Sequence, residues 1–412
     1  MTHRIPGCRA CGSPDLRPVL DLGQTPLANR LLPSAHPAEP EPTYPLELVF
    51  CPACSLVQIT ETVPPEILFA DYVYFSSFSD TMVAHARALA ERLVAERKLG
   101  SGQRVLEAAS NDGYLLQHYR QRGVQVLGIE PASNVAQVAV AERGVPTRVA
   151  FFGRATAQAL AGEGLTADVF HAHNVLAHVA DLNGFVAGIH TVLKPDGVAV
   201  IEAPYVRPFV EKREFDTIYH EHLCYFSLTA LDRLFRSHGL IIDDAEVVDI
   251  HGGSLRIFAR RGAPDTPARG SAVGLLQAER EAGVDQFEYY ARFAAEVDRL
   301  RQTLTGLLGD LKRAGCSLAA YGASAKGSTL LNVFGIGAGV LDFVADRSTV
   351  KQGKYTPGTR LPIVPPEELA LRRPDYCLLL TWNFEREILA QQTEYRLAGG
   401  RFIVPIPDVR VV

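Results

Sequence analysis

Residues 105–116 of the chain are Val105-Leu106-Glu107-Ala108-Ala109-Ser110-Asn111-Asp112-Gly113-Tyr114-Leu115-Leu116. The apolar start, the small residues in the middle and the apolar end predict a strand, a tight turn and the beginning of a helix. Small side chains in such a turn let a ligand approach the backbone closely. This stretch therefore predicts an α/β fold whose first strand leads into a ligand site.

The same alternation continues along the chain. Short apolar runs between helical segments are typical of a parallel sheet wrapped by helices, and they occupy 104–107, 124–130, 167–173 and 197–202. Gly252-Gly253 separates two further runs, 245–250 and 254–260, which predict an antiparallel hairpin at the end of this sheet. A long helical stretch from about 272 to 313 then precedes a second set of strands, predicted at 317–321, 341–346 and 376–381.

Two CxxC pairs stand near the N-terminus, formed by Cys8, Cys11, Cys51 and Cys54. In a reducing compartment, such pairs are better explained as thiolate ligands than as disulfides, and four sulfurs suit structural zinc. A redox pair or free thiols are the alternatives. We expect three domains: a small zinc-binding module over 1–70 and two Rossmann-like α/β domains over 71–265 and 266–412.

Composition excludes several classes of function. The 412 residues carry a net charge of −5, with 41 Lys and Arg against 46 Asp and Glu and no long basic run. A nucleic-acid partner is therefore not expected. No apolar stretch reaches the roughly 20 residues that span a bilayer, and Met1-Thr2-His3-Arg4-Ile5-Pro6 lacks the apolar core of a signal peptide. We expect a cytoplasmic monomer without a membrane partner.

Two carboxylates close the first two strands of the middle domain. Glu107 ends the first strand and Glu130 the second, where a carboxylate can accept hydrogen bonds from ribose hydroxyls. The turn is not GxGxxG, because Ala109 and Asn111 flank Ser110, so it suits an adenosine-type cofactor without phosphates. An α/β domain whose crevice holds nothing is the alternative.

The order of these elements resembles the class I S-adenosylmethionine methyltransferases. Ala109, Asn111 and Gly113 stand in place of the glycine-rich turn of that family. The resemblance puts Glu107, Glu130 and the following Pro131 at the cofactor, with Asn174 near its methionine part. Phe151 and Phe152 follow the third strand and can pack on the adenine, although adjacent phenylalanines are as often core residues.

Tyr219-His220-Glu221-His222 places a phenol, a carboxylate and two imidazoles in four consecutive positions. Such groups are rarely buried without partners, so the run indicates either a satisfied polar network or a site that moves protons. A carbon acceptor of a methyl group needs a base and a polar donor for its enolate. An extended backbone puts Tyr219 and Glu221 on one face, whereas a helical turn joins Tyr219 with His222. His178 follows Asn174 by one helical turn if a helix starts there, and can serve as polar support or catalyst.

Five motifs occur in the order found in three-domain sugar C-methyltransferases, and the chain resembles that family along its whole length. They are the paired CxxC motifs, Ser110-Asn111-Asp112-Gly113, Tyr219-His220-Glu221-His222, His251-Gly252-Gly253-Ser254-Leu255-Arg256 and Tyr321-Gly322-Ala323-Ser324-Ala325-Lys326-Gly327. The resemblance implies methylation of C3 of a nucleotide-linked, dTDP-type 4-keto-6-deoxy sugar in deoxysugar biosynthesis of the kind found in antibiotic pathways. It implies that His222 is the base, that Tyr219, Glu221 and His178 orient it and stabilise the enolate, and that Arg256 contacts substrate.

The turn Tyr321–Thr329 follows a strand and opens a helix, where backbone N–H groups, hydroxyls and one ammonium favour phosphate. We expect Ser324 and Lys326 to bind the diphosphate of a nucleotide sugar, unless the turn binds nothing. By the same family analogy, Tyr72, Tyr74, Ser76 and Ser77 in the linker before the middle domain contact substrate or cofactor; capping and packing are their alternative role.

Two other functions compete with sugar C-methylation. Asp346 ends the strand after the phosphate turn and permits an NAD-dependent nucleotide-sugar oxidoreductase. A zinc-ribbon RNA-binding module with an accessory methyltransferase is disfavoured by the acidic balance of charge.

Overall fold

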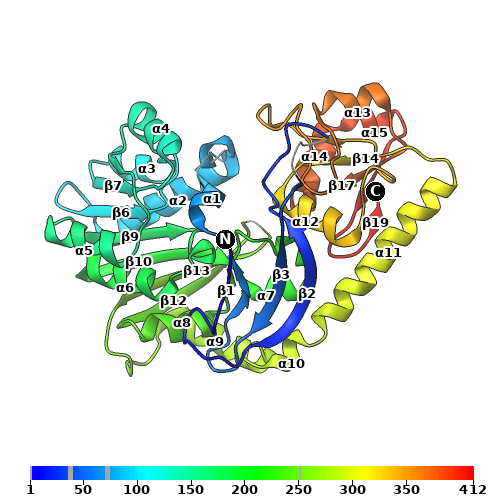
Figure 1. Cartoon of the computed structure of the whole chain (residues 1–412). Helices are drawn as coiled ribbons and strands as arrows, with labels where there is room; N and C mark the ends of the chain where they lie inside the picture. The colour runs from blue at the N-terminus through cyan, green and yellow to red at the C-terminus, as the bar shows by residue number, and fades with distance from the viewer. Residues whose placement is uncertain (1, 36–39, 70–74, 251) are drawn as a thin grey trace.

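The computed structural model describes residues 2–35, 40–69, 75–250 and 252–412. Figure 1 shows a central α/β unit and a C-terminal α/β unit on either side of an N-terminal module, with one long helix running below toward the C-terminal unit. Tyr72 and Tyr74 lie outside the described residues, as does His251.

The N-terminal module is a small antiparallel sheet of order β11-β4-β3-β2. Its own strands are β2 (Arg17–Pro26), β3 (Thr43–Phe50) and β4 (Val57–Ile59). The fourth, β11 (Cys224–Tyr225), comes from the middle of the chain and pairs with β4. Two short strands, β1 (His3–Arg4) and β5 (Glu61–Thr62), pair beside this sheet, and helix α1 (Pro65–Phe69) follows. The module is therefore completed by a segment that the sequence assigns to the next domain.

The central unit is a seven-stranded sheet of order β12-β13-β10-β9-β6-β7-β8. Its parallel strands are β6 (Arg104–Ala108), β7 (Gln125–Ile129), β8 (Thr147–Arg148), β9 (Ala167–His173) and β10 (Leu193–Pro204). The hairpin β12 (Leu240–Val248) and β13 (Ser254–Arg261) closes one edge antiparallel. In order of appearance in the chain, the strands lie 3-2-1-4-5-7-6 across the sheet. The predicted parallel sheet and its terminal hairpin are confirmed.

Helices cover both faces of this sheet (Figure 1). They are α2 (Asp80–Arg97), α3 (Leu116–Arg120), α4 (Ser133–Arg143), α5 (Arg154–Gly162), α6 (Leu182–Val192), α7 (Val206–Glu211) and α8 (Leu228–Arg236). Three short 3₁₀ turns, η1 (Ser76–Phe78), η2 (Leu176–His178) and η3 (Phe215–Thr217), stand near the carboxyl ends of the strands or in the segments that follow them. Ligand crevices of α/β sheets open at that edge.

The stretch predicted to be helical over 272–313 is helical over most of its length but is not continuous. It is divided into α9 (Gly270–Ala282), α10 (Phe287–Tyr290) and α11 (Phe293–Arg313). Gly283 follows α9 with a φ of +76°, the left-handed conformation that terminates a helix and that glycine adopts without steric cost. α11 is the long helix that leads to the C-terminal unit (Figure 1).

The C-terminal unit has a six-stranded sheet of order β16-β15-β14-β17-β18-β19. The strands are β14 (Leu318–Tyr321), β15 (Val344–Ala345), β16 (Ile363–Val364), β17 (Tyr376–Leu379), β18 (Arg401–Val404) and the antiparallel β19 (Arg410–Val411). The helices are α12 (Ala325–Phe334), α13 (Glu367–Arg372), α14 (Glu385–Gln391) and α15 (Thr393–Leu397), with the 3₁₀ turn η4 (Trp382–Phe384) before α14. β15 keeps only part of the strand predicted over 341–346.

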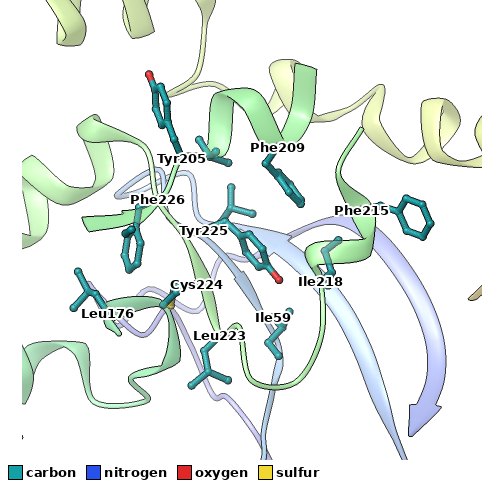
Figure 2. Packing of buried hydrophobic residues seen from close by; sticks show 14 of the residues in the cluster. Ile59, Leu176, Tyr205, Phe209, Phe215, Ile218, Leu223, Cys224, Tyr225 and Phe226 are labelled. Carbon is teal, nitrogen blue, oxygen red and sulfur yellow. The ribbon is translucent and has the colours of Figure 1, made fainter. Parts of the chain in front are cut away.

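One apolar core joins the three units around β11 (Figure 2). Tyr225 stacks on Phe209 with ring centroids 4.9 Å apart. Phe215 stacks on Phe334 of the C-terminal unit at 4.6 Å and 20°. Among the described residues, no helix is both long and apolar enough to cross a membrane.

Replacing Phe215 by Ala should destabilise the protein by about 3–5 kcal/mol, because it removes a fully buried ring from the contact between two units. Chemical denaturation measures this free energy. Phe78→Ala is the matched control, since Phe78 is 82% exposed and its loss should change stability by less than about 0.5 kcal/mol. Equal losses in both variants would contradict a shared core at Phe215.

Candidate active site

Tyr219 and His222 meet across a tight turn. The His222 N–H donates to the Tyr219 carbonyl at 2.8 Å, and the Tyr219 hydroxyl lies 2.9 Å from His222 Nε2. Of the two arrangements open to the sequence, the turn that joins Tyr219 with His222 is therefore the one adopted. His222 Nδ1 is 2.9 Å from the Thr217 carbonyl, which can only accept a hydrogen bond. In the neutral imidazole, Nδ1 therefore carries the proton and Nε2 presents its lone pair to the tyrosine.

His178 lies edge-on to His222, with ring centroids 4.9 Å apart at 61°. Its Nδ1 donates to the Glu221 carbonyl at 2.6 Å. Burial lowers the pKa of His178 to about 4, so this ring is neutral near pH 7. The helix expected to start at Asn174 starts instead at Leu176 as η2, because Asn174 has a φ of +54°.

Glu221 and His220 face the N-terminal module. Both carboxylate oxygens of Glu221 accept from Asn29 Nδ2, at 2.8 and 3.0 Å. Burial raises the pKa of Glu221 to about 7, and the Asn29 amide opposes that rise. His220 Nε2 donates to the Pro45 carbonyl at 3.1 Å and its ring meets Tyr44 edge-on. His220 thus anchors the Tyr219–His222 turn to β3.

The turn after β6 has the shape of a ligand cradle. Ala109, Asn111 and Gly113 have φ values of +52°, +49° and +78°, so the backbone turns away from strand geometry. Glu130 accepts the N–H groups of Asn111 and Ala132, each at 2.9 Å, which fixes the end of β7 beside the turn. Pro131 follows directly and is half-buried.

Four buried oxygen atoms at this edge have no hydrogen-bond partner among the described residues: Glu107 Oε2, Ser110 Oγ, Asp112 Oδ1 and Asn174 Oδ1. Burial, reinforced by the charges of Glu130, Asp112 and Glu202, raises the pKa of Glu107 well above its usual range. Such acceptors suit the ammonium group of an amino-acid moiety. The residues present therefore fit S-adenosylmethionine, the cofactor that the sequence predicts.

The phenylalanine and serine residues that the sequence also predicts at the cofactor or substrate lie in different parts of the structure. Phe152 packs in the core between Phe170 and Phe185, at 4.9 and 5.1 Å, whereas Phe151 is 47% exposed. The Ser76 N–H donates to Asn111 Oδ1 at 2.8 Å and the Ser77 hydroxyl donates to Asp112, so η1 is held against the cradle. Ser324 caps α12 by accepting the Gly327 N–H.

Arg256 lies in an internal ion cluster. It donates to Glu202 at 2.6 Å and to Glu246 at 3.1 Å, and its other terminal nitrogen contacts His85 of α2. Only 7% of the surface of Arg256 is exposed to solvent. The guanidinium thus fastens α2 to the sheet.

The four predicted zinc ligands converge. The sulfurs of Cys8, Cys11, Cys51 and Cys54 all lie within 4.8 Å of one another. Tetrahedral zinc with bonds near 2.3 Å requires sulfurs about 3.8 Å apart, and the pairs Cys8–Cys54 and Cys11–Cys51 are separated by 3.4 and 3.6 Å. Gln58 Nε2 donates to Cys8 at 3.2 Å and supports the thiolate from outside the cluster. These residues fit a closed structural zinc site.

Cys51→Ser should abolish binding of one zinc ion per chain and lower the unfolding temperature, because the metal organises the module that carries Asn29 and Pro45. Elemental analysis and calorimetry measure the two effects. Cys316→Ser, outside the cluster, is the control and should retain zinc. Full zinc content in Cys51→Ser would refute the four-cysteine site.

Glu221→Gln should flatten the dependence of stability on pH. Between the ordinary value near 4.5 and the folded value of about 7, the folded protein binds more protons at Glu221 than the unfolded chain does, so stability falls as pH rises. Glutamine keeps an oxygen for Asn29 but does not titrate. The variant should be more stable than the parent at pH 8, by about 1–3 kcal/mol. Glu142→Gln, exposed on α4, should leave the pH profile unchanged; matching profiles for all three proteins would contradict the raised pKa.

Three family models match the chain in succession. They are described as a zinc binding domain over residues 8–69, a methyltransferase domain over 82–244 and a C-methyltransferase C-terminal domain over 249–407. Sequence relatives include C-methyltransferase NovU of Streptomyces niveus, which is 38% identical over 99% of this chain and 97% of the relative. Ubiquinone biosynthesis O-methyltransferase of Methylocella silvestris is 32% identical over 24% of this chain and 38% of that protein.

Solved structures similar to the chain include magnesium protoporphyrin IX methyltransferase from Synechocystis PCC 6803 with bound SAH. It is 14% identical, covers 44% of this chain and 83% of that chain, and has a TM-score of 0.36. The full-length relative, together with the three matched domains, shows that the chain belongs to the three-domain, zinc-binding C-methyltransferases that use S-adenosylmethionine.

Proposed function

We propose that the enzyme methylates C3 of a dTDP-linked 4-keto-6-deoxy sugar through an enolate, in deoxysugar biosynthesis. When bound, S-adenosylmethionine supplies an activated methyl group, which a carbanion at C3 accepts. The protein must therefore remove a proton from carbon and stabilise the negative charge on the neighbouring ketone oxygen. The observation that carries this proposal is the geometry of His222, with Nε2 at the Tyr219 hydroxyl and Nδ1 at the Thr217 carbonyl.

His222 is assigned as the base because the Thr217 carbonyl holds its proton on Nδ1. The electron pair of the C3–H bond becomes the enolate as the proton moves to Nε2. The Tyr219 hydroxyl then donates toward the enolate oxygen, which a neutral phenol can do near pH 7. His178 supports the imidazole from its edge, and Glu221 holds the turn against Asn29.

The nucleotide end of the substrate is assigned to the start of α12, with Ser324 and Lys326. The linker residues Tyr72, Tyr74, Ser76 and Ser77 are assigned to contact substrate or cofactor, although Tyr72 and Tyr74 lie outside the described residues. The substrate contact expected of Arg256 stays a prediction. Its guanidinium donates to Glu202, whose carboxylate also lies within hydrogen-bond distance of the His85 ring. The oxidoreductase alternative receives no support from Asp346. Its carboxylate accepts the N–H groups of Ala323 and Ser348, at 2.7 and 2.8 Å, which gives it a role in fixing this turn that requires no NAD.

His222→Asn should abolish exchange of the C3 hydrogen of a dTDP-4-keto-6-deoxyhexose with deuterated solvent, because the base is lost. General-base catalysis typically contributes about 10²–10⁴-fold, and methylation should fall by that factor. Proton NMR and product mass spectrometry measure the two rates. His3→Asn, an exposed histidine, is the control. Parental C3 exchange in His222→Asn would reject His222 as the base.

A further inference from the structure

The segment just before the catalytic turn is held by the C-terminal unit. Asp216 is fully buried, and its Oδ2 accepts the Trp382 indole N–H at 2.7 Å. Lys326 Nζ stands 4.7 Å above the Trp382 ring, a cation–π contact. The ammonium also attracts the carboxylates of Glu214 and Asp216, whose pKa values burial raises. A buried carboxylate needs such partners, because water no longer solvates it.

Two further contacts fix the same segment. Thr329 of α12 donates its hydroxyl to the Ile218 carbonyl at 3.2 Å. Phe334, also on α12, stacks on Phe215, which lies at the start of η3 and points away from β11 in Figure 2. Helix α12 and the Trp382 indole, both from the C-terminal unit, therefore fix η3 at both of its ends.

These contacts fix the position of a backbone carbonyl to which His222 is hydrogen-bonded. The Thr217 carbonyl, at the end of η3, accepts from His222 Nδ1 at 2.9 Å and from the Tyr225 hydroxyl at 3.1 Å. If this carbonyl were displaced, Nδ1 would lose its hydrogen-bond acceptor. The preference for the proton on Nδ1 would then disappear, and the ring would be free to rotate away from Tyr219. A continuous chain of contacts therefore runs from Trp382 through Asp216 and Thr217 to the imidazole.

We propose that Trp382, with Asp216 and Lys326, is a positioning residue that aims the His222 base from the C-terminal unit. This inference rests on the proposed function, since it takes His222 as the base. The C-terminal unit then serves catalysis as well as substrate binding. A buried ionic contact can contribute little net stability because desolvation offsets the attraction, so its retention here is consistent with a positioning role.

Trp382→Phe keeps a ring under Lys326 but removes the donor to Asp216. The turnover number should fall by roughly tenfold to 100-fold, because misplacement of a catalytic group by about 1 Å has that effect. KM for the dTDP-4-keto-6-deoxyhexose should stay within about twofold of the parent. Asp216→Asn keeps an oxygen acceptor for the indole and should retain more turnover than Asp216→Ala. Phe384→Leu, in the same 3₁₀ turn but 45% exposed, is the control with unchanged turnover.

NMR of enzyme labelled with ¹⁵N-histidine gives a readout that needs no substrate. The parent should show His222 protonated at Nδ1, and Trp382→Phe should show a mixture of tautomers. Parental turnover and a parental His222 spectrum in Trp382→Phe would overturn the positioning role while leaving His222→Asn to decide the proposed function. If Trp382→Phe does not fold, Thr329→Val decides in its place, with a mixed spectrum supporting the proposal and a parental one rejecting it.

Discussion

The hydrogen bond from His222 Nδ1 to the Thr217 carbonyl is the contact on which the rest of the site depends. In the neutral imidazole it leaves the Nε2 lone pair directed at Tyr219, which is the state that the proposed role of His222 as a base requires. Each of the three units of the chain contacts the short segment that forms it. Asn29 binds Glu221 from the N-terminal module, His178 binds the Glu221 carbonyl from the central unit, and Trp382 binds Asp216 from the C-terminal unit.

This arrangement explains why a methyltransferase would bind a metal ion at a site separate from the one where the reaction takes place. Four cysteine ligands leave zinc no open position for substrate, so its contribution is structural. The zinc cluster stabilises the small sheet whose β3 contains Pro45 and whose β2 leads to Asn29. Because β11 extends that sheet, order in the zinc module is transmitted to the residues directly after His222.

The sequence predicts those features that depend on neighbouring residues. The strands of the central sheet, the cradle at Ala109–Gly113 and the cysteine cluster follow from local patterns and spacing. The Tyr219–His222 contact remained ambiguous because a four-residue run fits both an extended strand and a turn. Asn29 and Trp382 gave no signal, since they meet Glu221 and Asp216 across 192 and 166 residues of chain. The break at Gly283 was missed because a single glycine inside a helical pattern is often tolerated.

The position of the transferred methyl group tests the central claim most directly. The enzyme would be incubated with S-adenosylmethionine labelled with ¹³C in its methyl group and with a dTDP-4-keto-6-deoxyhexose, and the product examined by carbon–proton correlation NMR. If the enzyme deprotonates C3, the labelled methyl group should be bonded to C3 and the C3 proton signal should be lost. A labelled methyl group bonded to a sugar oxygen, or a product that retains the C3 hydrogen, would contradict it.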